Sequence, residues 1–333
     1  MAYNSLADFV QVLQQQGELR RVTHPVRTEL EIAEIADRVM KSQGPALLFE
    51  NVIGKQIPVL INAFGSAKRM ALALGVGDVQ EIAREIEKLV QTKPPKFFKD
   101  KLKLLSQLLS LAGIPPKAVK GGPCQEVVHR EPDLNLLPIL TCWPGDAGPF
   151  ITLPTVFSQD PIKGTRNVGL YRMQVYDART TGMHWHLHKV GARHYLHQKQ
   201  QKGRMELAVC LGGDPALIYA ATAPLPDQID EVLFTGFLRK KGLELVKGVT
   251  VDIEVPANSD IVIEGYVDPV QPLRREGPFG DHTGFYSLAD DYPVFHVTCI
   301  THKKNPIYPT TIVGRPIFSM HTCGTMVLNP REP

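Results

Sequence analysis

Two carboxylates five residues apart are the feature of this sequence best suited to chemistry. Glu276 and Asp281 flank the turn Gly277–Gly280, and His282 follows directly. Proline fixes φ and glycine allows positive φ, so this Gly-Pro-Phe-Gly turn is expected to be rigid and sharp. Carboxylates whose surroundings push their pKa values apart suit proton transfer. A solvated surface turn is the alternative, but the density of Gly, Pro and ionisable groups between two strand-like runs favours a functional site.

Asn167 and Arg172 form a second candidate pair, within the strand-like run Asn167–Tyr176. On an extended strand, residues at an odd separation point to opposite faces. A turn or bulge must therefore interrupt the run if both side chains serve one site.

Three alternating histidines, His184, His186 and His188, would share one face of a strand. Imidazole is a common metal ligand, so the pattern suggests a metal site, and a histidine-rich surface strand is the equally weighted alternative. Glu231 opens an amphipathic helix expected over Pro226–Lys241. By itself, Glu231 is interpreted as a charge stabilised by the helix dipole.

The elements that must position these residues fall into two regions. The first third of the chain is rich in helix signals, including a capping box at Thr28–Glu31. Gly113, Pro115 and Gly121–Pro123 then interrupt the pattern, which predicts a domain boundary near residue 120. The expected elements are a helix over Ile32–Met40, strands over Leu47–Val52 and Ile57–Ile61, a helix through Ile82–Val90, and a helix over Lys99–Ala112.

Short strand patterns with turn signals between them replace the helices from Cys124 onward, and only the helix over Pro226–Lys241 interrupts them. Many strands with few crossover helices predict a largely antiparallel barrel or sandwich. The expected strands are Thr152–Ser158, Asn167–Tyr176, Glu206–Leu211, Leu217–Ala221, Val249–Glu254, Ile261–Val267, Val294–Thr301 and Ile307–Val313.

Composition excludes several classes of protein. The 333 residues carry a formal net charge of +3, with 43% hydrophobic and 21% charged residues, which is typical of a globular protein and gives no nucleic-acid footprint. Five cysteines without a Cys-x-x-Cys pair argue against a disulfide framework or a structural zinc site. The N-terminus lacks a signal-peptide pattern, and no apolar run approaches the ~20 residues that span a bilayer. The cytoplasm is the expected location.

The run Arg275–Tyr286 and the strand Asn167–Arg172, together with the histidine cluster and Glu231, resemble the UbiD family of carboxy-lyases over roughly residues 5–316. The resemblance implies an α+β fold. An N-terminal α/β domain (1–120) would be followed by a mostly antiparallel split β-barrel that binds prenylated FMN (121–316). Residues 317–333 match nothing expected of the family at that point. They are interpreted as a divergent tail of a C-terminally truncated chain that largely lacks the family's C-terminal domain.

The implied activity is non-oxidative decarboxylation of an aromatic acid in quinone biosynthesis, with 4-hydroxy-3-polyprenylbenzoate as the leading substrate. A naphthoate decarboxylase of menaquinone biosynthesis and a truncated, non-catalytic flavin-binding relative are the alternatives. A flavin prenyltransferase would supply the cofactor. The resemblance further implies a homo-oligomer and peripheral membrane association through a lipophilic substrate. An unrelated histidine-rich metallohydrolase is disfavoured, because no His-Glu-x-x-His motif is present.

The resemblance also implies site residues. Asn167, His188 and Glu231 would bind a divalent metal, Mn²⁺ or Mg²⁺, which leaves His184 and His186 outside the metal shell. The backbone of Ala221–Ala223 would line a K⁺ position. The catalytic residues would be Arg172, Glu276 and Asp281, with Arg172 bridging the two carboxylates and Asp281 returning the proton. The cofactor-binding residues would be Asn167, Gly169, Leu170, Tyr171, Arg172, His188 and Glu231.

Overall fold

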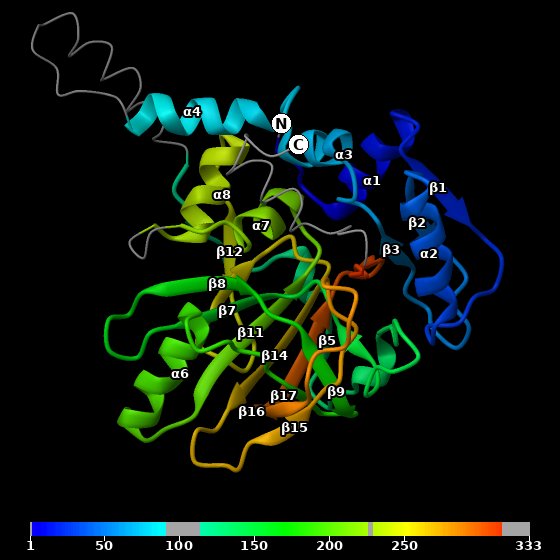
Figure 1. The fold of residues 1–333 in the computed structure, drawn as a ribbon. Coiled ribbons are helices and arrows are strands. Elements are labelled where there is room, and N and C mark those ends of the chain that lie inside the picture. The colour runs from blue at the N-terminus through cyan, green and yellow to red at the C-terminus, as the bar shows by residue number, and fades with distance from the viewer. Residues whose placement is uncertain (1, 91–113, 226–228, 315–333) are drawn as a thin grey trace, which may run out of the picture.

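The structure is a computed structural model that describes residues 2–90, 114–225 and 229–314 (Figure 1). The helix expected over Lys99–Ala112, the first residues of the helix expected from Pro226, and the tail 317–333 lie outside the described residues.

A nine-stranded antiparallel sheet carries the second region of the chain. Its strand order is β6-β9-β10-β17-β14-β11-β7-β8, and β5 pairs with β17. The central strand Ile261–Val267 is buried along almost its whole length, because the sheet is covered on both faces there. The strands are β5 (Val127–His129), β6 (Phe150–Ile151), β7 (Thr155–Gln159), β8 (Arg166–Leu170), β9 (Met173–Asp177), β10 (Thr180–Gly182), β11 (Met205–Leu211), β14 (Ile261–Val267) and β17 (Val294–His302).

The sheet curls into a half-barrel. Strand β8 ends the strand order and β9 is the second strand from its other end, yet only Tyr171 and Arg172 separate them in the chain. Two linking residues span at most about 11 Å between the strand ends, so the two ends of the sheet must approach each other. The predicted mostly antiparallel split barrel is confirmed, and the interruption predicted between Asn167 and Arg172 occurs at this link.

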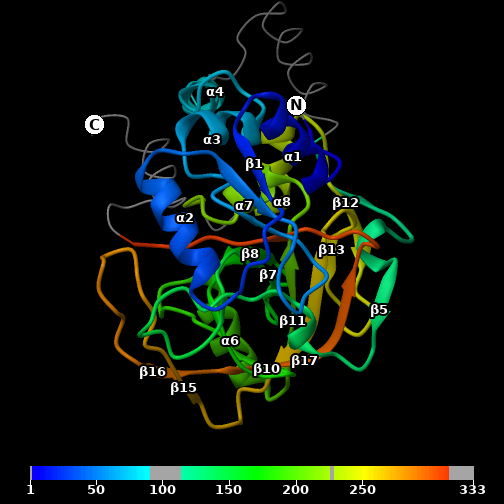
Figure 2. The ribbon, with the colours of Figure 1, turned by 90° about the vertical axis from the view of Figure 1, so that its right-hand side faces the viewer.

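A smaller four-stranded sheet, in the order β1-β2-β3-β18, forms the N-terminal region above the half-barrel (Figure 2). Strand β2 is parallel to β1 and antiparallel to β3, and β18 is parallel to β3. Alternate residues of β2 pack against α2 on one face and against α1 and α3 on the other. The elements are α1 (Leu6–Gln15), β1 (Leu19–Val22), α2 (Glu31–Lys41), β2 (Ala46–Phe49), β3 (Val59–Ile61), α3 (Ala67–Leu74), α4 (Gln80–Val90) and β18 (Tyr308–Pro309).

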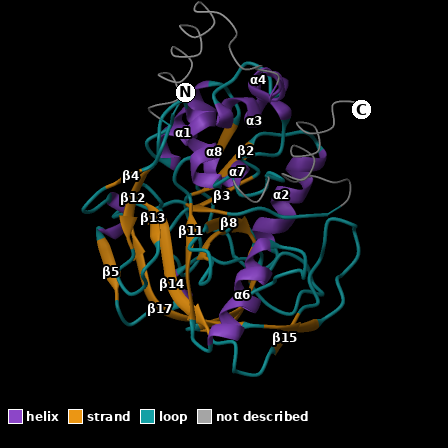
Figure 3. Cartoon of the chain, turned by 90° about the vertical axis from the view of Figure 1, so that its left-hand side faces the viewer, coloured by secondary structure: helices purple, strands orange, loops and turns teal. Residues whose placement is uncertain are grey.

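The two regions share their cores. One hydrophobic cluster joins α2 to residues of the half-barrel, and another joins α1 and α3 to α7 and α8. In Figure 3, α1, α3, α7 and α8 lie above the large sheet, and α6 lies beside its lower end. The domain bounds 1–120 and 121–316 therefore stay a prediction. The remaining elements are β4 (Lys117–Ala118), η1 (Pro123–Gln125), η2 (Leu134–Leu136), α6 (Val190–Gln201), α7 (Pro215–Ala220), α8 (Glu231–Arg239), β12 (Glu244–Lys247), β13 (Glu254–Pro256), β15 (Arg274–Glu276) and β16 (Asp290–Tyr292).

Several local predictions were wrong. The strand expected over Leu217–Ala221 is helix α7, whose N-cap Asp214 and first-turn proline are a helix-start signal. Most of Val249–Glu254 is irregular, and helix α6 was not predicted. Helix α2 begins after Leu30 and not at a Thr28 capping box: the Leu30 N–H donates to the Thr141 carbonyl (2.9 Å), and the Glu31 carboxylate accepts from the Arg27 N–H (2.8 Å).

No helix within the described ranges is long and apolar enough to cross a bilayer. The four cysteines found there are buried and free.

Candidate functional site

A buried ion pair joins Arg172, in the β8–β9 link, to Glu276 at the end of β15. The Nε and Nη2 atoms of Arg172 each lie 3.2 Å from Glu276 Oε1, and the Glu276 side chain is 0% exposed. Arg172 also donates to Ser287 Oγ (3.2 Å), and its guanidinium stacks over the Phe279 ring at 4.6 Å. A guanidinium held by three partners fixes the position of the carboxylate.

The turn after Glu276 is held by hydrogen bonds from both sides. The Gly277 N–H donates to Gln174 Oε1 (2.8 Å), and the Gly280 N–H donates to Asp146 Oδ1 (2.7 Å). Gly277 has a φ of +90°, which favours glycine. A Cβ on Gly280 would lie 2.2 Å from the Trp143 ring, so only glycine fits there. The rigid turn expected from the sequence is formed by these contacts.

Asp281 lies on this turn with its side chain 31% exposed. Burial opposes its ionisation, but hydrogen bonds from the His282 side chain (2.9 Å) and backbone N–H (2.8 Å), with the charges of His282 and Arg172, lower the pKa of Asp281. Among the described residues, Arg172 forms no ion pair with Asp281, so it acts on this carboxylate only at longer range. The expected bridge between the two carboxylates is formed on the Glu276 side alone.

The three alternating histidines do not lie on a strand. They belong to the link between β10 and α6, where His184 is buried while His186 and His188 are exposed. The Nδ1 of His184 is hydrogen-bonded to Glu276 Oε2, and the rings of His186 and His188 stack with centroids 5.8 Å apart. The prediction of a strand with three histidines on one face was wrong.

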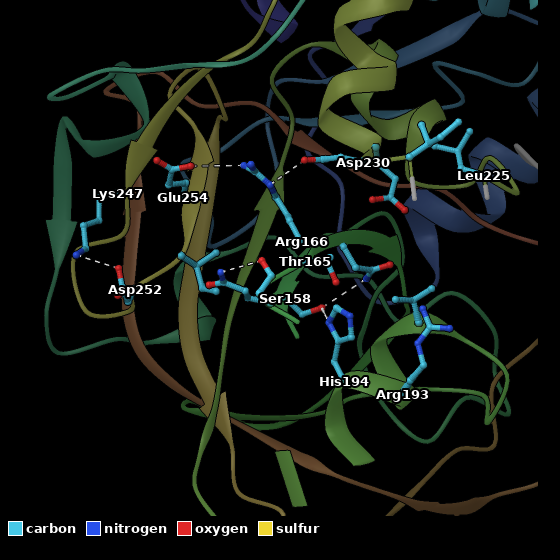
Figure 4. A pocket seen from close by; sticks show the side chains of 17 residues that line it. Ser158, Thr165, Arg166, Arg193, His194, Leu225, Asp230, Lys247, Asp252 and Glu254 are labelled. Carbon is cyan, nitrogen blue, oxygen red and sulfur yellow. Dashed lines mark hydrogen bonds and ion pairs between the residues drawn. The ribbon is translucent and has the colours of Figure 1, made fainter. Parts of the chain in front are cut away.

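A second group of predicted residues, Asn167 and Glu231, lines a cavity of about 710 Å³ (Figure 4). Asn167 is paired across β7–β8 with Ser158, and its Nδ2 lies 3.5 Å from Ser158 Oγ and 3.4 Å from the Tyr171 hydroxyl. Both contacts use the amide nitrogen, so the side-chain oxygen is the atom left to bind a ligand.

Glu231 is the first residue of α8, and its Oε2 accepts from the Val168 N–H of β8 (3.0 Å). Burial raises the pKa of Glu231 to about 7. Within the described chain no Lys, Arg or His lies within ion-pair distance of this carboxylate. A bound cation would supply the missing positive charge.

Arg166 brings positive charge into the same cavity. Its Nε lies 3.3 Å from Asp230 Oδ2 and its Nη1 lies 3.6 Å from Glu254 Oε2, so both atoms are ion-paired although neither forms a well-aligned hydrogen bond within the described residues. A guanidinium in a cavity wall can bind an anion such as a phosphate in exchange for such carboxylate partners. The cavity therefore offers ligands for a cation and donors for an anion side by side.

The structure brings some predicted residues together and separates others. Arg172, Glu276 and Asp281 do not line the cavity, and neither does His188. Tyr171 connects the two groups, because its hydroxyl lies near Asn167 and it directly precedes Arg172.

Gly169 lets the Tyr171 ring fold back, since a Cβ there would lie 2.2 Å from that ring. Leu170 packs against the core shared with α1 and α3. In the segment Ala221–Ala223, which was predicted to line a K⁺ position, the Ala223 carbonyl accepts from the Leu225 N–H.

Sequence reasoning missed three residues of these groups. Arg166 directly precedes Asn167, and an arginine beside a candidate ligand could have been noticed. His194 lies in α6 with its Nδ1 3.0 Å from Ser158 Oγ, and burial lowers the pKa of His194 to about 4. His184 was set aside with the other histidines. The positions of His194 and His184 depend on long-range packing, which leaves no local signal.

Solved structures with the same fold give the class of the protein. The UbiD-class enzyme HmfF from Pelotomaculum thermopropionicum, in an evolved dimeric form with prenylated FMN, is 31% identical with a TM-score of 0.84, covering 98% of this chain and 71% of that one. The vanillic acid decarboxylase of Sedimentibacter hydroxybenzoicus is 29% identical with a TM-score of 0.82, covering 95% of this chain and 65% of that one. The half-barrel with its N-terminal layer is thus the architecture of UbiD-class enzymes.

Family models identify the family itself. Residues 10–89 match the N-terminal domain of 3-octaprenyl-4-hydroxybenzoate carboxy-lyase, and residues 117–316 match its Rift-related domain. The chain belongs to the UbiD family. An uncharacterized protein of Archaeoglobus fulgidus is 50% identical over 317 residues, which cover 95% of this chain and 65% of that relative. The chain therefore spans slightly less than two thirds of the length of this curated relative.

Proposed function

We propose that this chain carries the site for non-oxidative decarboxylation of an aromatic acid with prenylated FMN. The observation that supports it most is the buried carboxylate of Glu276, held by Arg172 beside the Asp281 turn in a UbiD-family half-barrel. Decarboxylation leaves an electron pair that no amino-acid side chain can accept, and prenylated FMN, when bound, supplies that electron sink.

The cavity fits the phosphate end of such a cofactor. Asn167 and Glu231 would hold a divalent ion, Mn²⁺ or Mg²⁺, through an amide oxygen and a carboxylate, which are ligands that hard cations prefer. His188 is the proposed third ligand, and it would have to turn toward the cavity on binding. Arg166 would contact the phosphate in exchange for its ion pairs with Asp230 and Glu254. A K⁺ ion near Ala221–Ala223 stays part of the proposal.

Arg172, Glu276 and Asp281 would act on the substrate. Arg172 would hold the Glu276 carboxylate in place through their ion pair, and Asp281 would deliver a proton to the carbon that lost CO₂. The pKa of Asp281 is lowered in the free protein, so Asp281 is ionised at neutral pH before substrate binds. A substrate carboxylate that enters beside Asp281 would raise its proton affinity by like-charge repulsion. Asp281 would then take up a proton and hold it for transfer.

The proposed substrate is 4-hydroxy-3-polyprenylbenzoate, processed in the cytoplasm or at the membrane surface for quinone biosynthesis. The match to a carboxy-lyase of a polyprenylated hydroxybenzoate supports this choice, and the vanillic acid decarboxylase supports the wider class of hydroxylated benzoates. The dimeric form of HmfF supports a homo-oligomer. A flavin prenyltransferase would supply the cofactor.

The test is to co-express the chain with a flavin prenyltransferase and to assay the purified protein with carboxyl-labelled acids. The panel contains 4-hydroxy-3-polyprenylbenzoate, vanillate, 3,4-dihydroxybenzoate and a naphthoate. Release of labelled CO₂ from one of them, abolished by Glu276→Gln, is the expected result. A protein that carries the modified flavin and releases no CO₂ from any acid would show a flavin-binding chain without this activity.

A further inference from the structure

His184 has no part in the function proposed above, yet it contacts the carboxylate at its centre. Glu276 has two oxygen atoms, and each has its own partner: Arg172 binds Oε1, and His184 Nδ1 binds Oε2. Since a carboxylate only accepts hydrogen bonds, the Nδ1 of His184 carries the hydrogen. The Glu276 carboxylate is therefore fully paired although its side chain is completely buried.

His184 is itself held in place. Its ring packs against the Tyr292 ring with centroids 4.3 Å apart, and its Nε2 lies 3.3 Å from His186 Nε2. The side chain is only 10% exposed. A donor fixed on two sides and buried can hold Oε2 in one orientation, which a solvent molecule in an open site could not do.

The groups that face Glu276 come from four segments. Arg172 lies in the β8–β9 link, Tyr176 in β9, His184 in the β10–α6 link, and Asp290 and Tyr292 in β16. Burial, reinforced by the charge of Glu276, raises the pKa of Tyr176 to about 12 and also raises the pKa of Tyr292. Both tyrosines therefore stay neutral near pH 7. Arg172 and His184 are thus the two side chains of the described residues that donate hydrogen bonds to the Glu276 carboxylate.

We propose that His184 is a positioning residue, which fixes Oε2 of Glu276 and keeps this carboxylate ionised. A buried carboxylate that loses one of its donors is left with an unpaired oxygen, which favours protonation. The importance of His184 for turnover rests on the proposed role of Glu276. The contact itself, and its effect on protonation, can be measured without cofactor or substrate.

Infrared spectroscopy of the cofactor-free chain at neutral pH tests the proposal. His184→Leu removes the donor, whereas His184→Asn places an amide donor near the position of Nδ1. We expect a carboxylic-acid C=O band in the Leu variant, no such band in the wild type or the Asn variant, and loss of the band when Glu276→Gln is added to His184→Leu. His129→Leu, which removes a half-buried histidine whose partner is His302 and not Glu276, is the control and should show no band.

Absence of the band in a folded Leu variant would overturn the proposal. If the Leu variant does not fold, the activity-pH profile of the cofactor-loaded His184→Asn variant is measured instead. Because the amide holds a proton far more weakly than imidazole, an unchanged profile is expected if His184 acts only by positioning. Loss of one limb of the profile would show that His184 transfers protons. In the loaded protein, His184→Leu should lower kcat by about 10- to 100-fold with little change in KM, the loss that follows removal of a hydrogen bond to a charged group. The infrared result stands even if the chain decarboxylates nothing, so the two proposals fail separately.

Discussion

Glu231 illustrates how much the chemistry of one side chain depends on its surroundings. From the sequence it is an ordinary charge at a helix start, and in the fold it is a half-buried carboxylate that faces a cavity shared with Asn167. Neither property could be predicted from local sequence, because burial depends on how α8 packs against β8. The assignment of both residues as metal ligands came from family resemblance and stays a prediction.

Glu231→Gln should weaken Mn²⁺ binding by at least about 10-fold, because the amide keeps an acceptor for the Val168 N–H but loses the charge that attracts the cation. Titration of Mn²⁺ in the presence of FMN, followed by electron paramagnetic resonance, measures the change. Glu254→Gln is the matched control, since it removes one negative charge from the same cavity. Equal effects of the two substitutions would show that only the net charge of the cavity matters.

Asp281→Asn should slow protonation of the product carbon by roughly 10²- to 10⁴-fold, because the amide keeps the shape of the side chain but supplies no proton. Deuterium incorporation from D₂O at the former carboxyl position measures the step. Cofactor content should stay at the wild-type level. Asp291→Asn, at an exposed position of β16, serves as the control. Full activity in the Asp281 variant would remove this residue from the mechanism.

At the scale of elements, the half-barrel was predictable and its interruptions were only partly so. The spacing of Asn167 and Arg172 required a break in the strand, and the break between β8 and β9 is found there. The alternating histidines gave the wrong element: residues 183–189 follow an irregular path, in which His184 bonds to Glu276 while His186 and His188 are exposed. Period-two patterns predict a strand only where no long-range contact overrides them.

Gly280→Ala should displace the turn that carries Asp281, because the new Cβ would lie 2.2 Å from the Trp143 ring. The indole N–H of Trp143 donates to the Val313 carbonyl (3.1 Å), so its nuclear magnetic resonance signal should shift, while that of Trp185 stays in place. Gly121→Ala is the matched control, since nothing lies within 4 Å of a Cβ there. An unchanged Trp143 signal in the Gly280 variant would contradict the close packing of the turn.

At the scale of the whole molecule, the sequence predicted two regions but not the cores that join them. Residues of α1 and α3 pack with α7 and α8 across more than 100 positions of sequence, and such contacts leave no periodic signal. Ion pairs between elements are equally hidden. Glu18 accepts from Lys68 and from the buried Arg69, each at 2.9 Å, and so links the start of β1 to α3.

Glu18→Gln should lower the free energy of unfolding by about 2 kcal/mol near pH 7. Burial opposes ionisation, but the bonds from Lys68 and Arg69 outweigh it and lower the pKa of Glu18. A lowered carboxyl pKa stabilises the fold fully above the unfolded value, near 4.5, and this contribution is lost as pH falls through the folded value. The difference between wild type and variant in denaturant unfolding should therefore be constant above about pH 5.5 and vanish in acid. Glu85→Gln, which breaks an exposed pair with Lys240, should change stability by less than about 1 kcal/mol.

The pairing of β18 with β3 also bears on how the protein is made. Until Tyr308 and Pro309 have been synthesised, β3 has no partner on its outer side, and Tyr308 pairs with Val59 near the beginning of the chain. At about 5–20 residues per second, the ribosome needs on the order of tens of seconds to cover that interval. An open strand edge can pair with other chains during this time. One edge of β3 therefore stays without its strand partner for most of the synthesis, and α1, α2 and α3, which pack on the same sheet, are the elements made early enough to shield it.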